Sequence, residues 1–144
     1  MGCGECILIC PQEAIQVQWN QSVSVFLENM VEYALGTVRG KESKCLYINF
    51  ITNVSPACDC YGHNDAPIVR DIGVLASKDM VAIDQASADL VNREAASPGC
   101  CLKSNTEPGE DKFIGLYPKV DWQWLLTYAE SIGLGSRSYE LITI

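Results

Sequence analysis

Three stretches of the chain repeat apolar residues at three- and four-residue steps, which is the period of an amphipathic α-helix. They cover residues 22–40, 79–92 and 121–133. The first begins near Ser22 and stops near Gly40, and the other two begin at Asp79 and Asp121, whose side chains can accept hydrogen bonds from the first turn of a helix. The pattern therefore predicts three packed helices.

Strand-forming residues occupy the spaces between these helices. Residues 45–54, CLYINFITNV, are rich in β-branched and aromatic residues and predict a strand that is buried on both faces. A shorter strand is predicted for residues 72–76, and residues 139–144 are suited to one more. Residues 55–70 predict a loop, and residues 93–112 predict a long connection without regular structure. The alternation indicates an α/β fold with a small mixed sheet and about three packed helices.

The composition is that of an ordinary globular protein, with 144 residues, of which 48% are hydrophobic and 19% are charged. The net charge is −8, which argues against nucleic-acid and anionic-lipid partners because both are bound mainly through neutralisation of phosphates. No apolar run approaches the roughly 18 residues that a membrane-spanning helix needs, and no basic stretch precedes an apolar segment at the N-terminus. We therefore expect a cytoplasmic protein that binds neither nucleic acid nor membrane.

Eight cysteines are unusual in such a chain, and without an export signal they favour metal ligation or redox chemistry over disulfides. The first three form the pattern Cys3-x2-Cys6-x3-Cys10-Pro11. This pattern matches the last three cysteines and the proline of C-x2-C-x2-C-x3-C-P, with which bacterial-type ferredoxins bind [4Fe-4S] clusters. A zinc knuckle lacks a second ligand pair at suitable spacing here, and a thioredoxin-like site lacks the strand before the motif.

The ferredoxin pattern is incomplete in this chain. Its first cysteine would fall just before Met1, and the chain holds no second copy of the motif. In a two-cluster ferredoxin the proline-linked cysteine of each motif binds the other cluster. Cys3 and Cys6 would then serve one cluster and Cys10 the other, so neither cluster would receive four thiolates. We therefore expect this chain to be the C-terminal piece of a longer protein, and we expect it to bind little or no cluster alone.

Six stretches resemble the DUF362 family, which comprises iron–sulfur proteins of uncharacterised function with a two-cluster ferredoxin segment inside a larger α/β protein. These stretches are residues 3–15, 46–54, 58–60, 66–77, 78–92 and 132–142. The resemblance implies a partial ferredoxin-type motif in residues 1–19 and the C-terminal α/β portion of a DUF362-like domain in residues 20–144. It implies [4Fe-4S] clusters in the full-length parent but no known reaction. The chain departs from the family pattern at Arg70, where proline is typical, and in the absent front half of the ferredoxin segment.

A second cysteine loop, CDCYGHND, lies in residues 58–65. Its two thiols, imidazole and carboxylate belong to Cys58, Cys60, His63 and Asp65, which are candidate ligands for one Zn or Fe ion. The loop follows a predicted strand, and ligands of α/β sheets bind at strand ends. Against a metal site, alternate side chains of an extended segment point to opposite sides, so C-x-C is a less usual ligand spacing. Buried thiols and a solvated His63 are the alternative.

The remaining candidates have structural explanations. Asp84 interrupts an apolar helix stripe, so it needs a partner, with Lys78 as one candidate, or has a perturbed pKa. Cys100 and Cys101 are adjacent, and because a disulfide between neighbours is strained, two free thiols are predicted. The sequence also predicts that three stripe aromatics and one thiol lie in the core: Phe26, Trp122, Trp124 and Cys45.

Three functional hypotheses follow. The first is an iron–sulfur protein whose full-length parent passes electrons through two [4Fe-4S] clusters to or from a site in the α/β body. The second is a metal-binding α/β module without redox turnover, which uses the loop around Cys58. The third is a cluster-free interaction domain whose cysteines are vestigial. Glycine motifs for nucleotide binding are absent from the sequence, and it identifies no catalytic residue.

The expected binding partners follow from the same hypotheses. An electron carrier needs a redox partner, and a C-terminal piece would associate with the N-terminal portion of its parent. Because truncation would expose apolar surface that the missing portion covers, we also expect either a homodimer or a mobile N-terminus.

Overall fold

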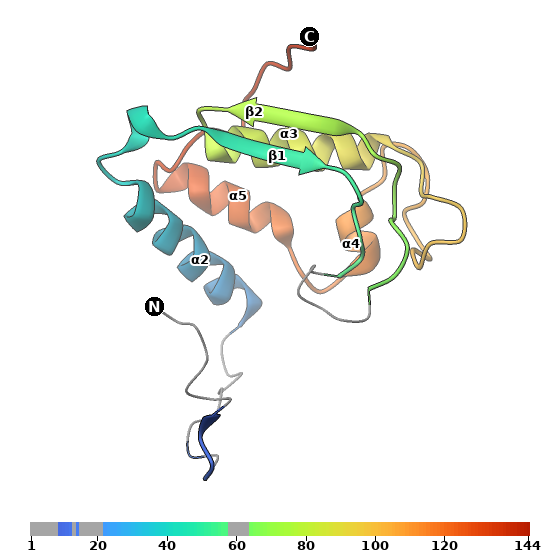
Figure 1. Ribbon diagram of the computed structural model, residues 1–144, viewed down its shortest axis with the longest axis horizontal. Helices are drawn as coiled ribbons and strands as arrows, with labels where there is room; N and C mark the ends of the chain where they lie inside the picture. Colours follow the sequence, from blue (N-terminus) through green and yellow to red (C-terminus); the bar gives the residue numbers. More distant parts are fainter. Residues whose placement is uncertain (1–8, 13, 15–21, 58–63) are drawn as a thin grey trace.

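The three amphipathic stretches form the three longest helices of the structure. The computed structural model describes residues 9–12, 14, 22–57 and 64–144. Its elements, in chain order, are α2 (Val23–Val38), a 3₁₀ turn (Glu42–Lys44), β1 (Tyr47–Ile51), β2 (Gly73–Ser77), α3 (Met80–Arg93), α4 (Lys112–Leu116) and α5 (Trp122–Ser131) (Figure 1). The predicted α/β fold class is confirmed, and α4 is a short helix that the sequence pattern missed. Within the described ranges, no helix has the length and apolar character needed to cross a membrane.

Polar side chains cap the starts of these three helices. Ser22 Oγ and Asp121 Oδ1 each accept a hydrogen bond from the backbone N–H three residues later, at 3.4 and 3.2 Å. Asp79 Oδ1 accepts two such bonds, from the N–H of Val81 at 2.9 Å and from that of Ala82 at 3.0 Å. The predicted helix starts are therefore confirmed, and each has a physical cause in one local side chain.

The sheet consists of two antiparallel strands in the part of the chain that the structure describes. Its register pairs Ile48 with Ala76 and Phe50 with Val74 on one face, while α3 packs against both strands on the other. The outer-face residues are exposed, and the Phe50 side chain reaches 71% exposure. The prediction that residues 45–54 form a strand buried on both faces is therefore wrong, because no described element covers the outer face.

The last residues, 139–144, do not form the strand that the sequence predicts. The segment that leads into them is fixed along α3 by side chains of that helix and its cap. The Ser136 N–H donates to Asp79 Oδ2 at 2.8 Å, and the Tyr139 hydroxyl donates to Asp89 Oδ2 at 2.7 Å. Burial, and then the hydrogen bond to Asp89, raise the pKa of Tyr139 above its ordinary value. These contacts tie the segment to the helix and not to a strand, so its first residues make no β ladder.

Two apolar clusters make up the core, and α3 contributes to both. The first joins α2, α3 and α5 and consists of the buried residues Val31, Val81, Leu126 and Ala129. The second joins the sheet, α3 and the loop after β1, and consists of Ile51, Ile68, Val69 and Val91. In Figure 1, α3 lies behind the two strands and α5 lies below them, next to α2. Helix α3 therefore joins the sheet to α5, and α2 packs mainly against α5.

Several side chains that the sequence places in the core lie at its edge. Phe26 is 55% exposed and Trp124 is 39% exposed, whereas Trp122 is half-buried and packs against the first cluster. The apolar stripe of α2 is wider than the surface that α5 covers, so Phe26 lies outside the contact. Trp124 Nε1 donates to Glu28 Oε1 at 2.9 Å, which makes a polar contact between α5 and α2 at the surface. Cys45 is half-buried, not buried as predicted.

A buried lysine orders the connection between α3 and α4. The Lys112 side chain is fully buried, and its Nζ donates to the backbone carbonyls of Glu107 at 2.6 Å, Glu110 at 2.9 Å and Asn92 at 3.5 Å. Three carbonyl acceptors match the three protons of an ammonium group. Residues 94–111 contain no helix or strand, as the sequence predicts, but these bonds hold their last turn against the end of α3.

We predict that Lys112→Met lowers the free energy of unfolding by about 2–4 kcal/mol, because three backbone carbonyls lose their charged donor and methionine supplies none. Urea denaturation monitored by circular dichroism measures the change. Lys103→Met is the matched control, because Lys103 lies exposed in the same connection and its effect should stay within about 0.5 kcal/mol. A loss below about 1 kcal/mol for Lys112→Met would show that these bonds contribute little to stability.

Candidate metal and cofactor site

The two arms that lead to the cysteine loop, residues 52–57 and 64–72, continue the antiparallel geometry of the sheet beyond the ends of its strands. The Ile72 N–H donates to the Ile51 carbonyl at 2.9 Å, and the Ile68 N–H donates to the Val54 carbonyl at 2.8 Å. Between these bonds Asn53 takes a left-handed φ of 50°, which asparagine tolerates better than most residues. The two arms of the loop therefore stay paired as far as its base.

Asn64 closes that base. Its Oδ1 accepts hydrogen bonds from the N–H of Ala57 at 3.2 Å and from that of Asp65 at 3.0 Å. Its Nδ2 donates to the Ala57 carbonyl and to Ser55 Oγ, each at 2.9 Å. One carboxamide thus bridges both arms, and it holds together the residues on either side of 58–63. We call this set of bonds the Asn64 clamp.

Helix α4 fastens the same loop from outside. The hydroxyl of Tyr117, the C-cap residue of α4, donates to the Pro56 carbonyl at 2.6 Å. At the other end of α4, Asp111 caps the helix and accepts a bond from Trp122 Nε1 at 2.9 Å, which joins α4 to α5. Figure 1 shows α4 next to the arms of the loop. The incoming arm of the loop is therefore held between the sheet and α4, a helix that the sequence pattern did not predict.

Of the four predicted metal ligands in the loop, only Asp65 falls within the described residues. Cys58, Cys60 and His63 lie outside them, so their grouping stays a prediction. Asp65 is exposed, and its Oδ1 accepts a hydrogen bond from the N–H of Ala66 at 2.7 Å. Among the side chains that the structure describes, no three from His, Cys, Asp and Glu gather closely enough to hold a metal ion.

The N-terminal motif is also described only in part. Cys3 and Cys6 lie outside the described residues, as does most of the predicted unit 1–19. Cys10 is half-buried, and its Sγ accepts a hydrogen bond from the N–H of Ala14 at 3.3 Å. The ligand roles of these three cysteines therefore stay predictions, as does the expected dimer or mobile N-terminus.

Asp84 finds its partner on β1. Its Oδ1 accepts a hydrogen bond from Asn49 Nδ2 at 2.9 Å, and Asn49 Nδ2 also lies 3.0 Å from Ser87 Oγ, to which it donates. The partner is thus Asn49 and not Lys78, since Asn49 faces α3 from the inner side of the sheet and donates its hydrogen bond to the Asp84 carboxylate. Asn49 is a residue that sequence reasoning missed, since nothing local connects two positions 35 residues apart.

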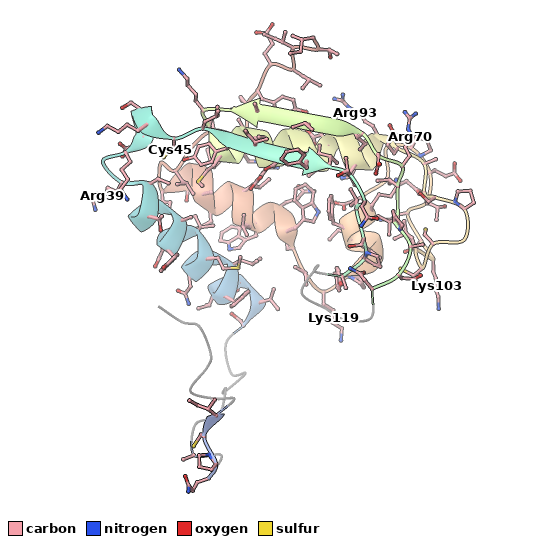
Figure 2. All side chains as sticks on the ribbon, in the orientation of Figure 1. Arg39, Cys45, Arg70, Arg93, Lys103 and Lys119 are labelled. Atoms are coloured by element: carbon pink, nitrogen blue, oxygen red, sulfur yellow. The ribbon has the colours of Figure 1, made fainter. Side chains whose placement is uncertain are left out.

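Three other thiols fall within the described residues after α2. Cys100 and Cys101 are free, as predicted, and half-buried, and Cys101 packs against the second apolar cluster, which also contains Ile68 of the returning arm. Figure 2 shows Cys45 at the start of β1, so the length of the strand separates it from the loop. Burial, and then the neighbouring Cys45 thiol, raise the pKa of Tyr47 above its ordinary value.

A comparison with protein families places both the cysteine loop and most of the N-terminal motif in a shared domain. The family model described as "Domain of unknown function (DUF362)" matches residues 5–89, which is more than half of the chain. The chain belongs to the DUF362 family. No curated protein and no solved structure shows a significant match. In this DUF362 protein the matched span contains α2, both strands and most of α3, whereas α4, α5 and the C-terminal segment follow it.

Arg70 forms an ion pair at the position where the DUF362 pattern was expected to hold proline. Its Nε lies 2.6 Å from Glu94 Oε2, and its Nη2 donates to Glu94 Oε1 at 3.0 Å. The hydrogen bond from Arg70 lowers the pKa of Glu94, and the same bond raises that of Arg70. Because the Arg70 side chain is 78% exposed, water screens the pair, which fastens the returning arm of the loop only weakly to the end of α3.

We predict that Asn64→Ala removes the protection of the Ala57 and Asp65 amides from hydrogen exchange, because both N–H groups donate to Asn64 Oδ1. The Ile68 amide should stay protected, since it pairs with the opposite arm and not with Asn64. Exchange detected by NMR measures all three. Ser55→Ala is the matched control, because it removes one acceptor of the clamp and leaves both amide bonds in place. Continued protection of Ala57 in Asn64→Ala would show that the carboxamide does not hold the base.

Proposed function

We propose that this DUF362 protein is an iron–sulfur protein of the electron-transfer type, in which Cys3, Cys6 and Cys10 are thiolate ligands of [4Fe-4S] clusters. The observation that carries the proposal is the spacing Cys3-x2-Cys6-x3-Cys10-Pro11. In bacterial-type ferredoxins the short steps let successive thiolates bind one cubane, and the proline-linked cysteine binds the neighbouring one. The spacing therefore assigns Cys3 and Cys6 to one cluster and Cys10 to a second.

The surroundings of Cys10 fit a thiolate ligand. The Ala14 N–H donates to its Sγ at 3.3 Å, and hydrogen bonds to cysteine sulfur are among the factors that set the reduction potential of iron–sulfur clusters. Thiolates are soft, charged donors and therefore suit iron. A bound cluster supplies one-electron transfer, while the part of this chain is to hold the thiolates and to direct the Ala14 N–H at one of them.

We predict that the incomplete pattern becomes a two-cluster site when the missing donors are supplied. A version of the chain is extended at its N-terminus by one full C-x2-C-x2-C-x3-C-P motif and by a cysteine placed three residues before Cys3. After anaerobic reconstitution it should bind about eight irons and about eight sulfides. The chain without the extension should bind far less, because its motif offers three thiolates. Iron and acid-labile sulfide analysis measures the occupancy, and electron paramagnetic resonance of the reduced sample identifies the clusters.

Two sets of serine substitutions in the extended chain show which thiols bind iron. Replacement of the three motif cysteines should leave about half the iron or less, because one cluster then lacks two of its four thiolates and the other lacks one. The matched control replaces the three described thiols outside the motif, Cys45, Cys100 and Cys101. This control should keep its full iron content, and equal iron contents in the two variants would overturn the proposal.

A second candidate function is metal binding by the loop after β1. The observation that favours it is the Asn64 clamp, which holds the two ends of the loop together. Cys58, Cys60, His63 and Asp65 would offer two thiolates, an imidazole and a carboxylate, a donor set that suits tetrahedral zinc or iron. Asp65 Oδ1 accepts a backbone hydrogen bond, so this carboxylate would offer Oδ2 to a metal ion.

We predict that the loop binds about one Zn²⁺ per chain and that Cys58→Ser with Cys60→Ser abolishes the binding, because two of four donors are lost. The assay uses chains in which the motif cysteines are already serine, so that these thiols do not compete. Equilibrium dialysis followed by metal analysis measures the stoichiometry. Cys100→Ser with Cys101→Ser is the matched control, since it removes another close pair of thiols. Stoichiometric zinc in the Cys58 and Cys60 variant would refute the loop site.

A further inference from the structure

We propose that the outer edge of β1 binds an extended strand of a partner polypeptide. The partner strand would add to the sheet as a third strand, insert apolar side chains into the cleft beside β1, and place a lysine or arginine against Asp84. Three observations on the described residues lead to this site: a strand edge that none of them pairs, an apolar cleft along that edge, and one carboxylate that no lysine or arginine among them meets in that cleft.

The strand edge supplies the main-chain part of the recognition. In the described ranges the sheet ends at β1, and Figure 1 shows this strand on the side of the sheet that faces α5. An edge strand presents a row of unpaired N–H and C=O groups, which proteins usually protect with proline or charged residues. The sequence of β1, YINFI, contains neither. Its edge is therefore open to strand addition, in which main-chain hydrogen bonds provide affinity.

A cleft of about 470 Å³ runs along this edge and supplies the apolar part. It is bounded by β1, α3, α4 and α5, with Val91, Phe113, Trp122 and Leu126 among its lining residues. The rings of Phe113 and Trp122 contact each other with centroids 5.4 Å apart and form one end wall. A strand added beside β1 would lie roughly 4.8 Å from it, and every second side chain would then point toward α3 and α5. The cleft offers the space that such side chains need.

The Asp84 carboxylate indicates which charge the site favours on the partner strand. It lines both this cleft and an adjoining cavity of about 180 Å³ between α2, α3 and α5. Its Oδ1 accepts a hydrogen bond from the Asn49 carboxamide. No lysine or arginine is among the described residues that line the cleft or the adjoining cavity. Figure 2 shows the five basic residues that it labels, Arg39, Arg70, Arg93, Lys103 and Lys119, at the periphery of the molecule. Charge complementarity therefore favours a basic side chain on the incoming strand.

Two other arrangements fit the same features less well. A second copy of this chain that paired β1 with β1 about a two-fold axis would bring the same edge together twice. It would also bring together two chains that each carry a net charge of −8, which charge complementarity disfavours. The opposite edge of the sheet, along β2, adjoins a cavity of about 350 Å³ that is lined in part by residues 139–142 and Ile144 of the chain itself. A partner strand at β2 would have to displace these residues, whereas the cleft at β1 is open.

The test uses the full chain and a synthetic peptide in which threonine and valine alternate around a central lysine. We expect NMR titration to show binding, and we expect the peptide to slow amide hydrogen exchange in β1 but not in β2. Asp84→Asn should weaken binding by about threefold to fivefold, as for an ion pair open to solvent. The matched control is Glu140→Gln, which removes a carboxylate at the β2 edge and should leave the affinity unchanged.

Two further peptides keep the test independent of any effect of Asp84→Asn on folding. With central glutamate the peptide should bind the unaltered protein more weakly than the lysine peptide. With alternate residues N-methylated it should not bind, because it cannot make the ladder of main-chain hydrogen bonds. The proposal is overturned if the lysine peptide does not bind, if it protects β2 and not β1, or if lysine and glutamate peptides bind equally. A dimer detected by sedimentation, with the β1 amides already protected from exchange in the absence of peptide, would also overturn it.

Discussion

The hydrogen bonds of the Asp79 carboxylate are the interactions on which the arrangement of β2, α3 and the C-terminal segment depends. Its Oδ1 caps α3 through two backbone N–H groups, and its Oδ2 accepts the N–H of Ser136 from the segment after α5. Gly135 lies so close to this carboxylate that a Cβ atom at that position would overlap it, which explains the need for glycine there. Since only two residues separate β2 from α3, and α3 packs against both strands, this single group aligns the sheet, the central helix and the C-terminal segment.

The features that the sequence predicts well are those with local causes. The bounds of α2, α3 and α5 follow from apolar periodicity and from capping side chains within three residues of each helix start. The exposure of Phe50 and Phe26 could not be predicted in this way, because it depends on what covers β1 and α2 in space. The bond from Tyr117 to Pro56 spans 61 residues, and a local pattern contains no trace of it.

The candidate site also has features that a local sequence pattern predicts and features that depend on the fold. Cysteine spacing predicts the candidate donors, because the short steps between Cys3, Cys6 and Cys10 are a property of the sequence itself. The residue that closes the second loop, Asn64, was not predicted, although an asparagine followed by aspartate in a loop is a known turn signal. Its role depends on Ser55 and Ala57 lying opposite, and that depends in turn on the pairing of Ile68 with Val54. Donor identity is therefore a sequence property in this protein, and donor placement is a property of the folded hairpin.

The span that the DUF362 family shares does not contain all of the core that surrounds it. Val31 and Val81, both within residues 5–89, meet in one cluster with Leu126 and Ala129 of α5, which lies beyond the matched residues. Helix α2 makes its main helix contact with α5. The span matched by the DUF362 model thus contains the cysteine loop and both strands, while the packing of α2 depends on α5, which lies outside that span.

The buried ammonium of Lys112 gives the connection before α4 an unusual character. A segment of this length without regular elements ordinarily behaves as a separate, early-melting unit of a protein. Here its carbonyls accept hydrogen bonds from a fully buried ammonium group, and they cannot leave without depriving that charge of its acceptors. We therefore expect the connection and the end of α3 to open as one cooperative foldon, although the connection contains no helix or strand.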